Sequence, residues 1–256
     1  MHAVIFDVDG VLVASPHEPA WRAALAGLMA GEWRAFAPTA ADPSGRFTTA
    51  VYQEHVAGKA RVDGAAALLE YFGMPRSAQF ATTLAARKQD LLDVLIRRGE
   101  FQAFEDGLRL VRALRLRGVR LGVASSSKNA DRFMRGVPLD SGETLRDAFD
   151  ANVCGRDLPR GKPHPDIFLL AAQELRVAPE RCVVVEDATS GIRAAAAAGM
   201  RGLGVARLDD AMLLETAGAE LVVTNLDQVG VDALVRGHLE RAPEQSALGV
   251  AASYPC

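Results

Sequence analysis

Ala-Val-Ile-Phe-Asp-Val-Asp-Gly, residues 3–10, joins four apolar residues to two closely spaced aspartates. The apolar run is typical of a short, fully buried strand. Asp7 and Asp9 follow where a parallel strand would leave the sheet, and Gly10 tolerates the dihedral angles of a sharp turn. Ligand sites in open parallel sheets lie at the carboxyl ends of the strands. Two carboxylates at such a place repel each other unless a cation or a proton lies between them.

The composition is that of an ordinary globular protein with room for a large core. The chain has 256 residues, of which 49% are hydrophobic and 24% charged, and its formal net charge is −3. This charge predicts no nucleic-acid surface, and no apolar stretch is long and uncharged enough to span a membrane. The cysteines, Cys154, Cys182 and Cys256, suit reduced thiols better than a disulfide framework. We therefore expect a monomeric cytoplasmic protein without nucleic-acid or membrane partners.

Residues 16–98 carry helical patterns and no convincing strand. One helix is predicted from Ser77, a favourable N-cap, to about Arg98, and Gly99 ends it. A polar turn between helices is predicted at 56–64. The block therefore predicts a helical cap domain inserted after the first strand.

From residue 101 onward, strand patterns alternate with helical ones. The expected strands are 120–124, 151–154, 182–185, 202–205 and 221–223, and the expected helices are 107–116, 165–177 and 189–198. This spacing predicts an α/β core with a doubly wound parallel sheet. The core domain would comprise residues 1–15 and 99–240, the cap domain 16–98, and a loosely held tail 241–256.

Polar clusters follow four of these apolar segments, directly or in the loop behind a strand: Asp7/Asp9, the Ser125 group, Lys162 and Glu186/Asp187. Mg²⁺ prefers oxygen ligands and commonly binds one or two carboxylates, waters and a substrate phosphate. Carboxylates of this set, with a backbone carbonyl near Asp9, suit such an ion. Each cluster alone is weak evidence, but their common placement behind strands indicates a single site.

The same side chains also suit phosphoryl transfer. A carboxylate can act as a nucleophile and form an aspartyl-phosphate. The attack needs its charge neutralised, which a metal on one side and Lys162 on the other would do. Ser125 could hold phosphoryl oxygens, and Asp9 is placed to give a proton to the leaving oxygen and later take one back.

Three longer strings resemble motifs of the haloacid-dehalogenase-like phosphotransferases: Phe-Asp-Val-Asp-Gly-Val-Leu (6–12), Gly-Lys-Pro-His-Pro-Asp-Ile-Phe (161–168) and Glu-Asp-Ala-Thr-Ser-Gly-Ile-Arg-Ala-Ala (186–195). The resemblance implies a Rossmann-like core with a helical cap, Asp7 as nucleophile and Asp9 as acid/base. It assigns Ser125 to the second motif and Lys162 to the third. It also implies a Mg²⁺ site made by Asp7, Asp9, Glu186 and Asp187.

Within that family, Ser125-Ser126-Ser127-Lys128-Asn129 and the cap turn Gly58-Lys59-Ala60-Arg61 are similar to those of the β-phosphoglucomutases. The likeness implies a set of substrate-binding residues: His17, Lys59, Arg61, Lys88, Ser126, Ser127, Lys128 and Asn129.

The residues themselves leave the roles in the cap open. Lys88 interrupts an apolar helical stripe, so that its ammonium either reaches water beyond a buried stem or faces a ligand. Arg61 with Lys59 could bind a second anionic group, although each alone is more often a solvated turn residue. His17 could be a hinge residue, a hydrogen-bond partner of Asp9, or the start of a helix.

We expect a Mg²⁺-dependent phosphotransferase that acts on a phosphorylated sugar, converting β-glucose 1-phosphate to glucose 6-phosphate with glucose 1,6-bisphosphate as the activating intermediate. The alternative is a sugar-phosphate phosphatase with the same catalytic residues, in which water takes the phosphoryl group. A nucleotide-binding module is disfavoured, because the first strand turn lacks the Gly-x-Gly-x-x-Gly pattern.

Overall fold

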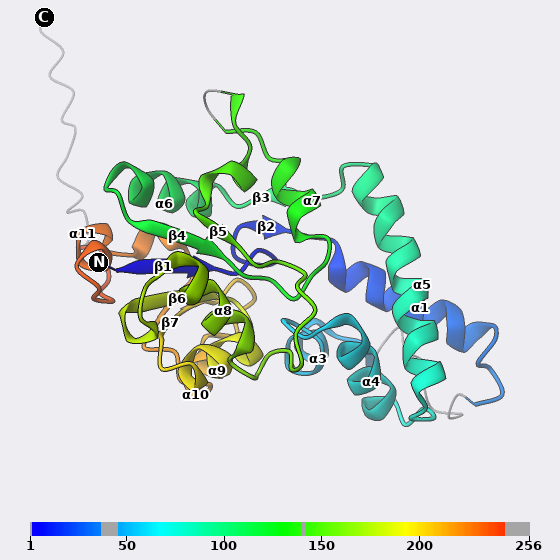
Figure 1. Cartoon of the computed structure of the whole chain (residues 1–256). Coiled ribbons are helices and arrows are strands. Elements are labelled where there is room, and N and C mark those ends of the chain that lie inside the picture. Colours follow the sequence, from blue (N-terminus) through cyan, green and yellow to red (C-terminus); the bar gives the residue numbers. More distant parts are fainter. Residues whose placement is uncertain (1, 37–45, 140–141, 244–256) are drawn as a thin grey trace, which may run out of the picture.

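β1 (Ala3–Phe6) lies in the middle of a six-stranded parallel sheet with the order β5-β4-β1-β6-β7-β8 (Figure 1). The structure is a computed structural model and describes residues 2–36, 46–139 and 142–243. The other strands of this sheet are β4 (Arg120–Val123), β5 (Ala151–Asn152), β6 (Cys182–Glu186), β7 (Arg201–Val205) and β8 (Leu221–Val223). The predicted doubly wound parallel sheet is confirmed.

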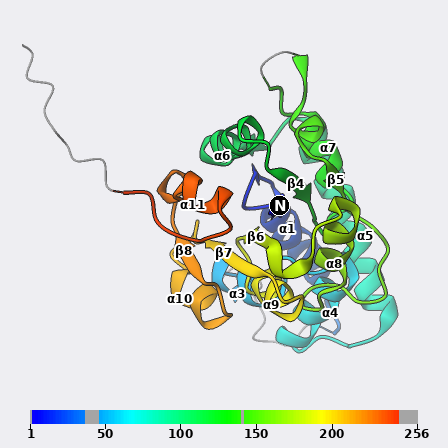
Figure 2. The same ribbon diagram turned by 60° about the vertical axis from the view of Figure 1, so that its left-hand side comes forward.

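The two faces of the sheet bury alternate residues of β1, as the two-residue period of a strand requires. Val4 and Phe6 belong to an apolar cluster that includes side chains of α6 (Glu105–Leu116), α7 (Ala130–Arg135) and α11 (Val231–Val235). Ala3 and Ile5 pack instead with α8 (Asp166–Leu175) and α9 (Thr189–Ala197). Figure 2 shows these helices on opposite sides of the sheet.

The remaining short elements connect these layers. They are α10 (Ala211–Thr216) and the 3₁₀ turns η2 (Leu145–Ala148), η3 (Pro179–Arg181) and η4 (Leu226–Gln228).

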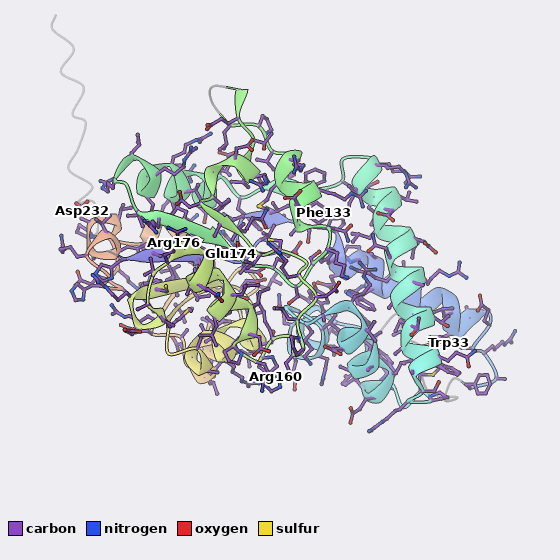
Figure 3. All side chains as sticks on the ribbon, viewed as in Figure 1. Trp33, Phe133, Arg160, Glu174, Arg176 and Asp232 are labelled. Carbon is purple, nitrogen blue, oxygen red and sulfur yellow. The ribbon has the colours of Figure 1, made fainter. Side chains whose placement is uncertain are left out.

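Four helices form a second body with an apolar core of its own: α1 (His17–Ala30), α3 (Thr49–His55), α4 (Arg61–Tyr71) and α5 (Ala78–Arg97). Trp33 belongs to this core and lies at its end far from the sheet (Figure 3). Ser77 caps α5, since its Oγ accepts a hydrogen bond from the backbone N–H of Phe80 at 3.2 Å. Within residues 16–36 and 46–98 the chain forms helices and no strand, as predicted.

A two-stranded antiparallel ribbon lies where the chain passes between the two bodies. β2 (Val13–Ala14) pairs with β3 (Gln102–Ala103), and the backbone N–H of Phe104 donates to the carbonyl of Leu12 at 2.9 Å. The sequence does not predict this ribbon, because strands of two residues show no periodicity. It ties together the two chain connections to the helical body.

Several predicted bounds were wrong for local reasons. The turn expected at 56–64 is shorter, because α4 already begins at Arg61. The strand expected at 151–154 stops at Asn152, whose side-chain oxygen accepts a hydrogen bond from the N–H of Cys154 at 3.0 Å. The helix expected at 165–177 ends at Leu175, because Arg176 adopts a left-handed conformation with φ of 55° (Figure 3).

The division into a core of residues 1–15 and 99–240 and a cap of residues 16–98 stays a proposal. Most of the expected tail, residues 241–256, lies outside the described part of the chain, but Arg241 donates a hydrogen bond to the carbonyl of Val222 at 2.6 Å. In the part of the chain that the structure describes, no helix is long and apolar enough to cross a membrane.

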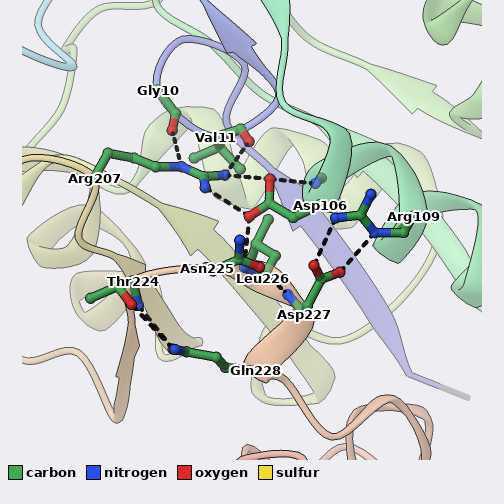
Figure 4. Close-up of polar contacts among 11 residues, drawn as sticks. Gly10, Val11, Asp106, Arg109, Arg207, Thr224, Asn225, Leu226, Asp227 and Gln228 are labelled. Carbon is green, nitrogen blue, oxygen red and sulfur yellow. Dashed lines mark hydrogen bonds and ion pairs between the residues drawn. The ribbon is translucent and has the colours of Figure 1, made fainter.

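A buried ion pair anchors the turn that follows Asp9 (Figure 4). The Arg207 guanidinium lies 2.7 Å from a carboxylate oxygen of Asp106 and donates to the carbonyls of Gly10 and Val11 at 3.3 Å each. It also stacks over Phe104, with 4.0 Å between the guanidinium carbon and the ring centroid.

Asp106 has further hydrogen-bond donors besides Arg207. The backbone N–H groups of Gly107 and Leu226 donate to its oxygens at 2.9 and 2.7 Å. Burial would raise the pKa of the Asp106 carboxyl, but the bonds from Arg207 and these N–H groups hold it below its usual range. The pair therefore ties α6 and the loop after β7 to the turn that carries the aspartates.

Replacing Asp106→Asn should lower the free energy of unfolding by about 3 kcal/mol at pH 7, because Arg207 keeps a buried charge without its partner. The matched control is Asp227→Asn, which breaks the exposed pair with Arg109 (Figure 4) and should cost at most about 1 kcal/mol. Urea unfolding measures both.

The difference in stability between wild type and Asp106→Asn should depend on pH, because the folded-state pKa of Asp106 is depressed. The carboxylate stabilises the fold above its unfolded-state pKa of about 3.9, and this contribution disappears as pH falls through the folded-state value. The gap between wild type and Asp106→Asn should therefore narrow below about pH 4. Equal decreases in the free energy of unfolding for Asp106→Asn and Asp227→Asn at pH 7 would contradict the stabilising role of the Asp106–Arg207 ion pair.

Candidate active site

Lys162 lies between two carboxylates at the carboxyl edge of the sheet. Its Nζ is 2.6 Å from Asp7 Oδ1 and 2.6 Å from Glu186 Oε1, and the side chains of Lys162 and Glu186 are fully buried. Burial alone would lower the pKa of Lys162, but the two carboxylates raise it, so the side chain stays charged. β1 and β6 are neighbouring strands, which is why residues 179 positions apart in sequence, Asp7 and Glu186, share one ammonium.

Negative charge exceeds positive charge at this edge. Burial raises the pKa of Glu186 to about 7 and, with help from Glu186, Asp7 and Asp9, raises the pKa of Asp187 well above its usual value. The pKa of Asp7 is raised for the same main reason, burial. Buried carboxylates in such proximity favour a proton or a further cation beside Lys162.

Glycines leave the space that these carboxylates occupy. Gly10 has φ of +85°, and a Cβ added to it would lie 1.8 Å from Asp187 Oδ2. A Cβ on Gly191 would likewise lie 1.8 Å from Glu186 Oε1. The carboxylate of Asp187 therefore lies directly against the backbone of the turn after Asp9.

The carboxylates of Asp7, Glu186 and Asp187 suit Mg²⁺, because this ion prefers oxygen ligands. Glu186 has both oxygens engaged, since Oε1 faces Lys162 and Oε2 accepts from the N–H of Ala188 at 2.9 Å. Among the described residues no three His, Cys, Asp or Glu side chains are grouped as a metal site. An ion bound by Asp7 and Asp187 would complete its shell with backbone oxygen, water and ligand oxygen, as Mg²⁺ commonly does.

Asp9 lies beside this group and points toward the helical body. Ser125 Oγ donates to Asp9 Oδ2 at 3.3 Å and accepts from the N–H of Ser127 at 3.1 Å. The other oxygen, Asp9 Oδ1, is buried without a hydrogen-bond partner, and His17 Nε2 lies 3.5 Å from it. Burial raises the pKa of Asp9, which favours its carrying a proton.

The helical body contributes a chain of nitrogen groups. His17, the first residue of α1, lies with Nε2 3.1 Å from Ser127 Oγ and with Nδ1 3.4 Å from Lys88 Nζ. Burial, with Lys88 and Arg61 nearby, lowers the pKa of His17 well below its usual value, so the ring is neutral. Of the three roles considered for His17, helix start agrees with its position, whereas its hydrogen-bond partner is Ser127 and not Asp9, from which Nε2 lies 3.5 Å away.

Lys88 is 3% exposed, so its ammonium does not reach water, and that alternative is wrong. Its Nζ lies 5.3 Å from the ring centroid of Trp21 and forms no ion pair with any carboxylate among the described residues. Burial, and next the charge of Arg61, lower its pKa to about 7. Arg61 begins α4 and is near enough to Lys88 for its charge to lower the pKa of that lysine.

Other predicted substrate-binding residues bond to protein groups. Lys59 Nζ donates to the carbonyl of His55 at 2.7 Å, and Lys128 forms an exposed ion pair with Asp157 at 2.5 Å, so neither joins the group around Lys88. Ser126 Oγ donates to the carbonyl of Gly58 at 2.9 Å.

Asn129 forms a reciprocal amide pair with Gln89 of α5, with N–O distances of 3.0 and 3.2 Å. Gln89 escaped our sequence analysis, as did Ser190, whose hydroxyl donates to the carbonyl of Ala57 at 2.9 Å. Tyr52 was also missed: burial, together with Asp9 and Asp187, raises its pKa well above the usual value. Single polar residues on helices carry no sequence signal for such contacts.

A sequence profile for haloacid dehalogenase-like hydrolases matches residues 1–199. The chain belongs to this family. The predicted resemblance is thereby confirmed, and the six-stranded parallel sheet with helices on both faces agrees with it.

Relatives in the family include a β-phosphoglucomutase of Mycobacterium bovis, 33% identical over 252 residues, with 90% of this chain and 91% of the relative covered. A phosphorylated carbohydrates phosphatase of Thermotoga maritima is 30% identical, with 87% and 94% covered. The crystal structure of an archaeal β-phosphoglucomutase from Pyrococcus superposes with a TM-score of 0.68 at 29% identity, covering 93% of this chain and 98% of that one. The family therefore holds both mutase and phosphatase relatives of this chain.

Replacing Lys88→Met should stabilise the protein in acid and neutral solution, because it removes an amine whose charging is opposed by burial. The folded-state pKa of about 7 lies below the unfolded value of about 10.4, so the unfolded chain binds more protons between these values and wild-type stability gains with rising pH there. The variant's advantage should be largest at pH 6 and shrink toward pH 10.

Thermal unfolding at several pH values tests this prediction. Lys128→Met is the matched control, since that lysine lies in an exposed ion pair. An unchanged or lowered melting temperature for Lys88→Met at pH 6 would contradict the burial of Lys88 without a carboxylate partner.

Proposed function

We propose that the protein is a Mg²⁺-dependent phosphotransferase that converts β-glucose 1-phosphate to glucose 6-phosphate. The observation that carries the proposal is Lys88, a buried amine with Arg61 nearby and no carboxylate partner among the described residues, in addition to Lys162 beside Asp7. A bisphosphorylated sugar needs an anion-binding group at each end. The mutase relative that covers 90% of this chain supports the same reaction.

In the first half-reaction an oxygen of Asp7 would attack the phosphorus at C1 of glucose 1,6-bisphosphate, and the bond from that phosphorus to the sugar oxygen would break, which releases glucose 6-phosphate. Asp9, whose pKa is raised by burial, would give its proton to the departing oxygen. Lys162 and Ser125 would face the phosphoryl oxygens, since both lie beside the nucleophile's loop. The product is an aspartyl-phosphate on Asp7 and a free sugar hydroxyl.

In the second half-reaction the 6-hydroxyl of β-glucose 1-phosphate would attack the phosphorus on Asp7, which regenerates glucose 1,6-bisphosphate. Asp9 would take the hydroxyl proton while the bond from phosphorus to Asp7 breaks. Mg²⁺, held by Asp7, Asp187 and a backbone carbonyl near Asp9, would neutralise phosphoryl charge during both steps. Arg61, Lys88 and His17 would hold the phosphate that is not transferred.

The second candidate is a sugar-phosphate phosphatase with the same residues. The relative named as a phosphorylated carbohydrates phosphatase, which covers 87% of this chain, favours it. In that reaction water would attack the aspartyl-phosphate, and inorganic phosphate would leave. The two functions differ in how well the helical body keeps water from Asp7.

One incubation with Mg²⁺, β-glucose 1-phosphate and a trace of glucose 1,6-bisphosphate separates the two functions. We expect glucose 6-phosphate without matching release of phosphate, measured together over time. Phosphate release without isomerisation would replace the mutase by the phosphatase, and the absence of both products would contradict both. Asp7→Asn is the control and should abolish every product, because an amide is a poor nucleophile.

Replacing Arg61→Ala should raise the KM for β-glucose 1-phosphate by about 10- to 100-fold, the usual effect of losing a charged hydrogen bond. Hydrolysis of p-nitrophenyl phosphate, which has a single anionic group, should change little. Arg76→Ala is the matched control, because Arg76 lies beyond the end of α4 and forms an exposed ion pair with Glu70 of that helix. An unchanged KM would remove Arg61 from the binding site.

A further inference from the structure

Two serine hydroxyls of the sheet body donate to consecutive carbonyls of one loop in the helical body. Ser126, in the loop after β4, donates to the carbonyl of Gly58 at 2.9 Å. Ser190, in the first turn of α9, donates to the carbonyl of Ala57 at 2.9 Å and is itself 6% exposed. The two bonds bridge the bodies across sequence separations of 68 and 133 residues.

The loop needs such donors, because it follows the end of α3 at His55. Carbonyls just beyond a helix end have no partner in the next turn. Gly58 has φ of +72°, and a Cβ added to it would lie 2.5 Å from Ser190 Oγ and 3.8 Å from Lys162 Cδ. The loop therefore lies tightly against the sheet body, beside the lysine that contacts Asp7.

The same loop leads directly into the proposed anion-binding residue. α4 begins at Arg61, three residues after Gly58. A Cβ on Gly161, next to Lys162, would lie 3.6 Å from Ala60 Cβ, so the loop is packed against the sheet body up to the helix start. Where Arg61 lies relative to Asp7 thus depends on how residues 57–60 are docked.

We propose that Ser126 and Ser190 are positioning residues that hold the loop at Ala57 and Gly58 closed, set Arg61 over the site and exclude water from phosphorylated Asp7. The proposal rests on the proposed function, since it concerns the fate of the aspartyl-phosphate. It also gives Ser126 a role other than direct substrate binding. When the loop opens, water would replace both hydroxyls as donors and would gain access to the phosphorus.

Two ordinary hydrogen bonds together shift an equilibrium by roughly 5- to 100-fold. The double variant Ser126→Ala/Ser190→Ala should therefore open the loop more often by about that factor. Neither change should prevent folding: Ser190 lies in a helix, where alanine is favourable, and Ser126 lies in a loop. Thr216→Ala is the matched control, since its hydroxyl bonds to the carbonyl of Met212 within α10.

Hydrogen exchange of the free protein tests the closure without any substrate. We expect amides of residues 56–64 to exchange about 5- to 100-fold faster in the double variant, with unchanged exchange in β1 and β6. Unchanged exchange at 56–64, or acceleration throughout the chain, would overturn the proposal. This result stands even if the wild-type protein fails to act on glucose phosphates, so the two failures are distinguishable.

The kinetic measurement is the phosphate released per glucose 6-phosphate formed. This ratio should rise in the double variant and stay unchanged in Thr216→Ala, whereas general destabilisation would lower both products equally. Faster exchange at 56–64 with an unchanged ratio would overturn the role in excluding water.

Gly58→Ala gives a second route to the same result while keeping both hydroxyls. Its Cβ would meet Ser190 Oγ and push the loop outward. Gly99→Ala is its control, because Gly99 has φ of +70° with nothing within 4 Å of an added Cβ. Gly58→Ala should raise the amount of phosphate released per glucose 6-phosphate formed, and Gly99→Ala should not. Equal changes of this ratio in both variants would contradict the proposal that the loop at Gly58 excludes water.

Discussion

The ammonium of Lys162 is held at 2.6 Å from Asp7 and at 2.6 Å from Glu186, and all three side chains are buried. Removing such a charge leaves its partners unpaired in a poorly solvated place, which is strongly unfavourable. The glycines at 10 and 191 have no room for a Cβ because the neighbouring carboxylates fill that space. Packing of the adjacent turns thus depends on this charge arrangement, and the excess of carboxylates suits a site that binds a cation.

The two bodies of the protein meet around this charge group through both polar and apolar contacts. His17 contacts Ser127, and Gln89 pairs with Asn129. Ser126 and Ser190 of the sheet body donate to carbonyls in the loop before α4. Polar contacts exchange readily with water at modest net cost, so they suit an interface that opens for a substrate and closes again. Apolar contact between the bodies is local: Ala20 of α1 and Leu92 of α5 belong to the core cluster of the sheet body, whereas most apolar residues of the helical body form a cluster of their own.

The family contains relatives named as mutases and as phosphatases with comparable coverage of this chain. In the mechanisms that we propose, the residues around Lys162 would serve both reactions, because each would begin with attack by Asp7. The two proposed reactions differ in the acceptor, which is a sugar hydroxyl or water, and under our proposal the interface between the bodies would control access of that acceptor. Under the proposed function, Lys88 and Arg61 on the helical side would favour an acceptor that carries its own anionic group.

The sequence by itself determined the parallel sheet, the inserted helices and the convergence of Asp7, Ser125, Lys162 and Glu186, because polar residues behind parallel strands must meet at one edge. It did not determine in which direction the loop side chains point or which groups they contact. Lys128 turns outward to Asp157 within the sheet body. Ser126 bonds to the carbonyl of Gly58 and Lys88 is buried, which depend on how the helical body is packed. Such contacts join residues far apart in sequence through single side chains, and no local periodicity records them.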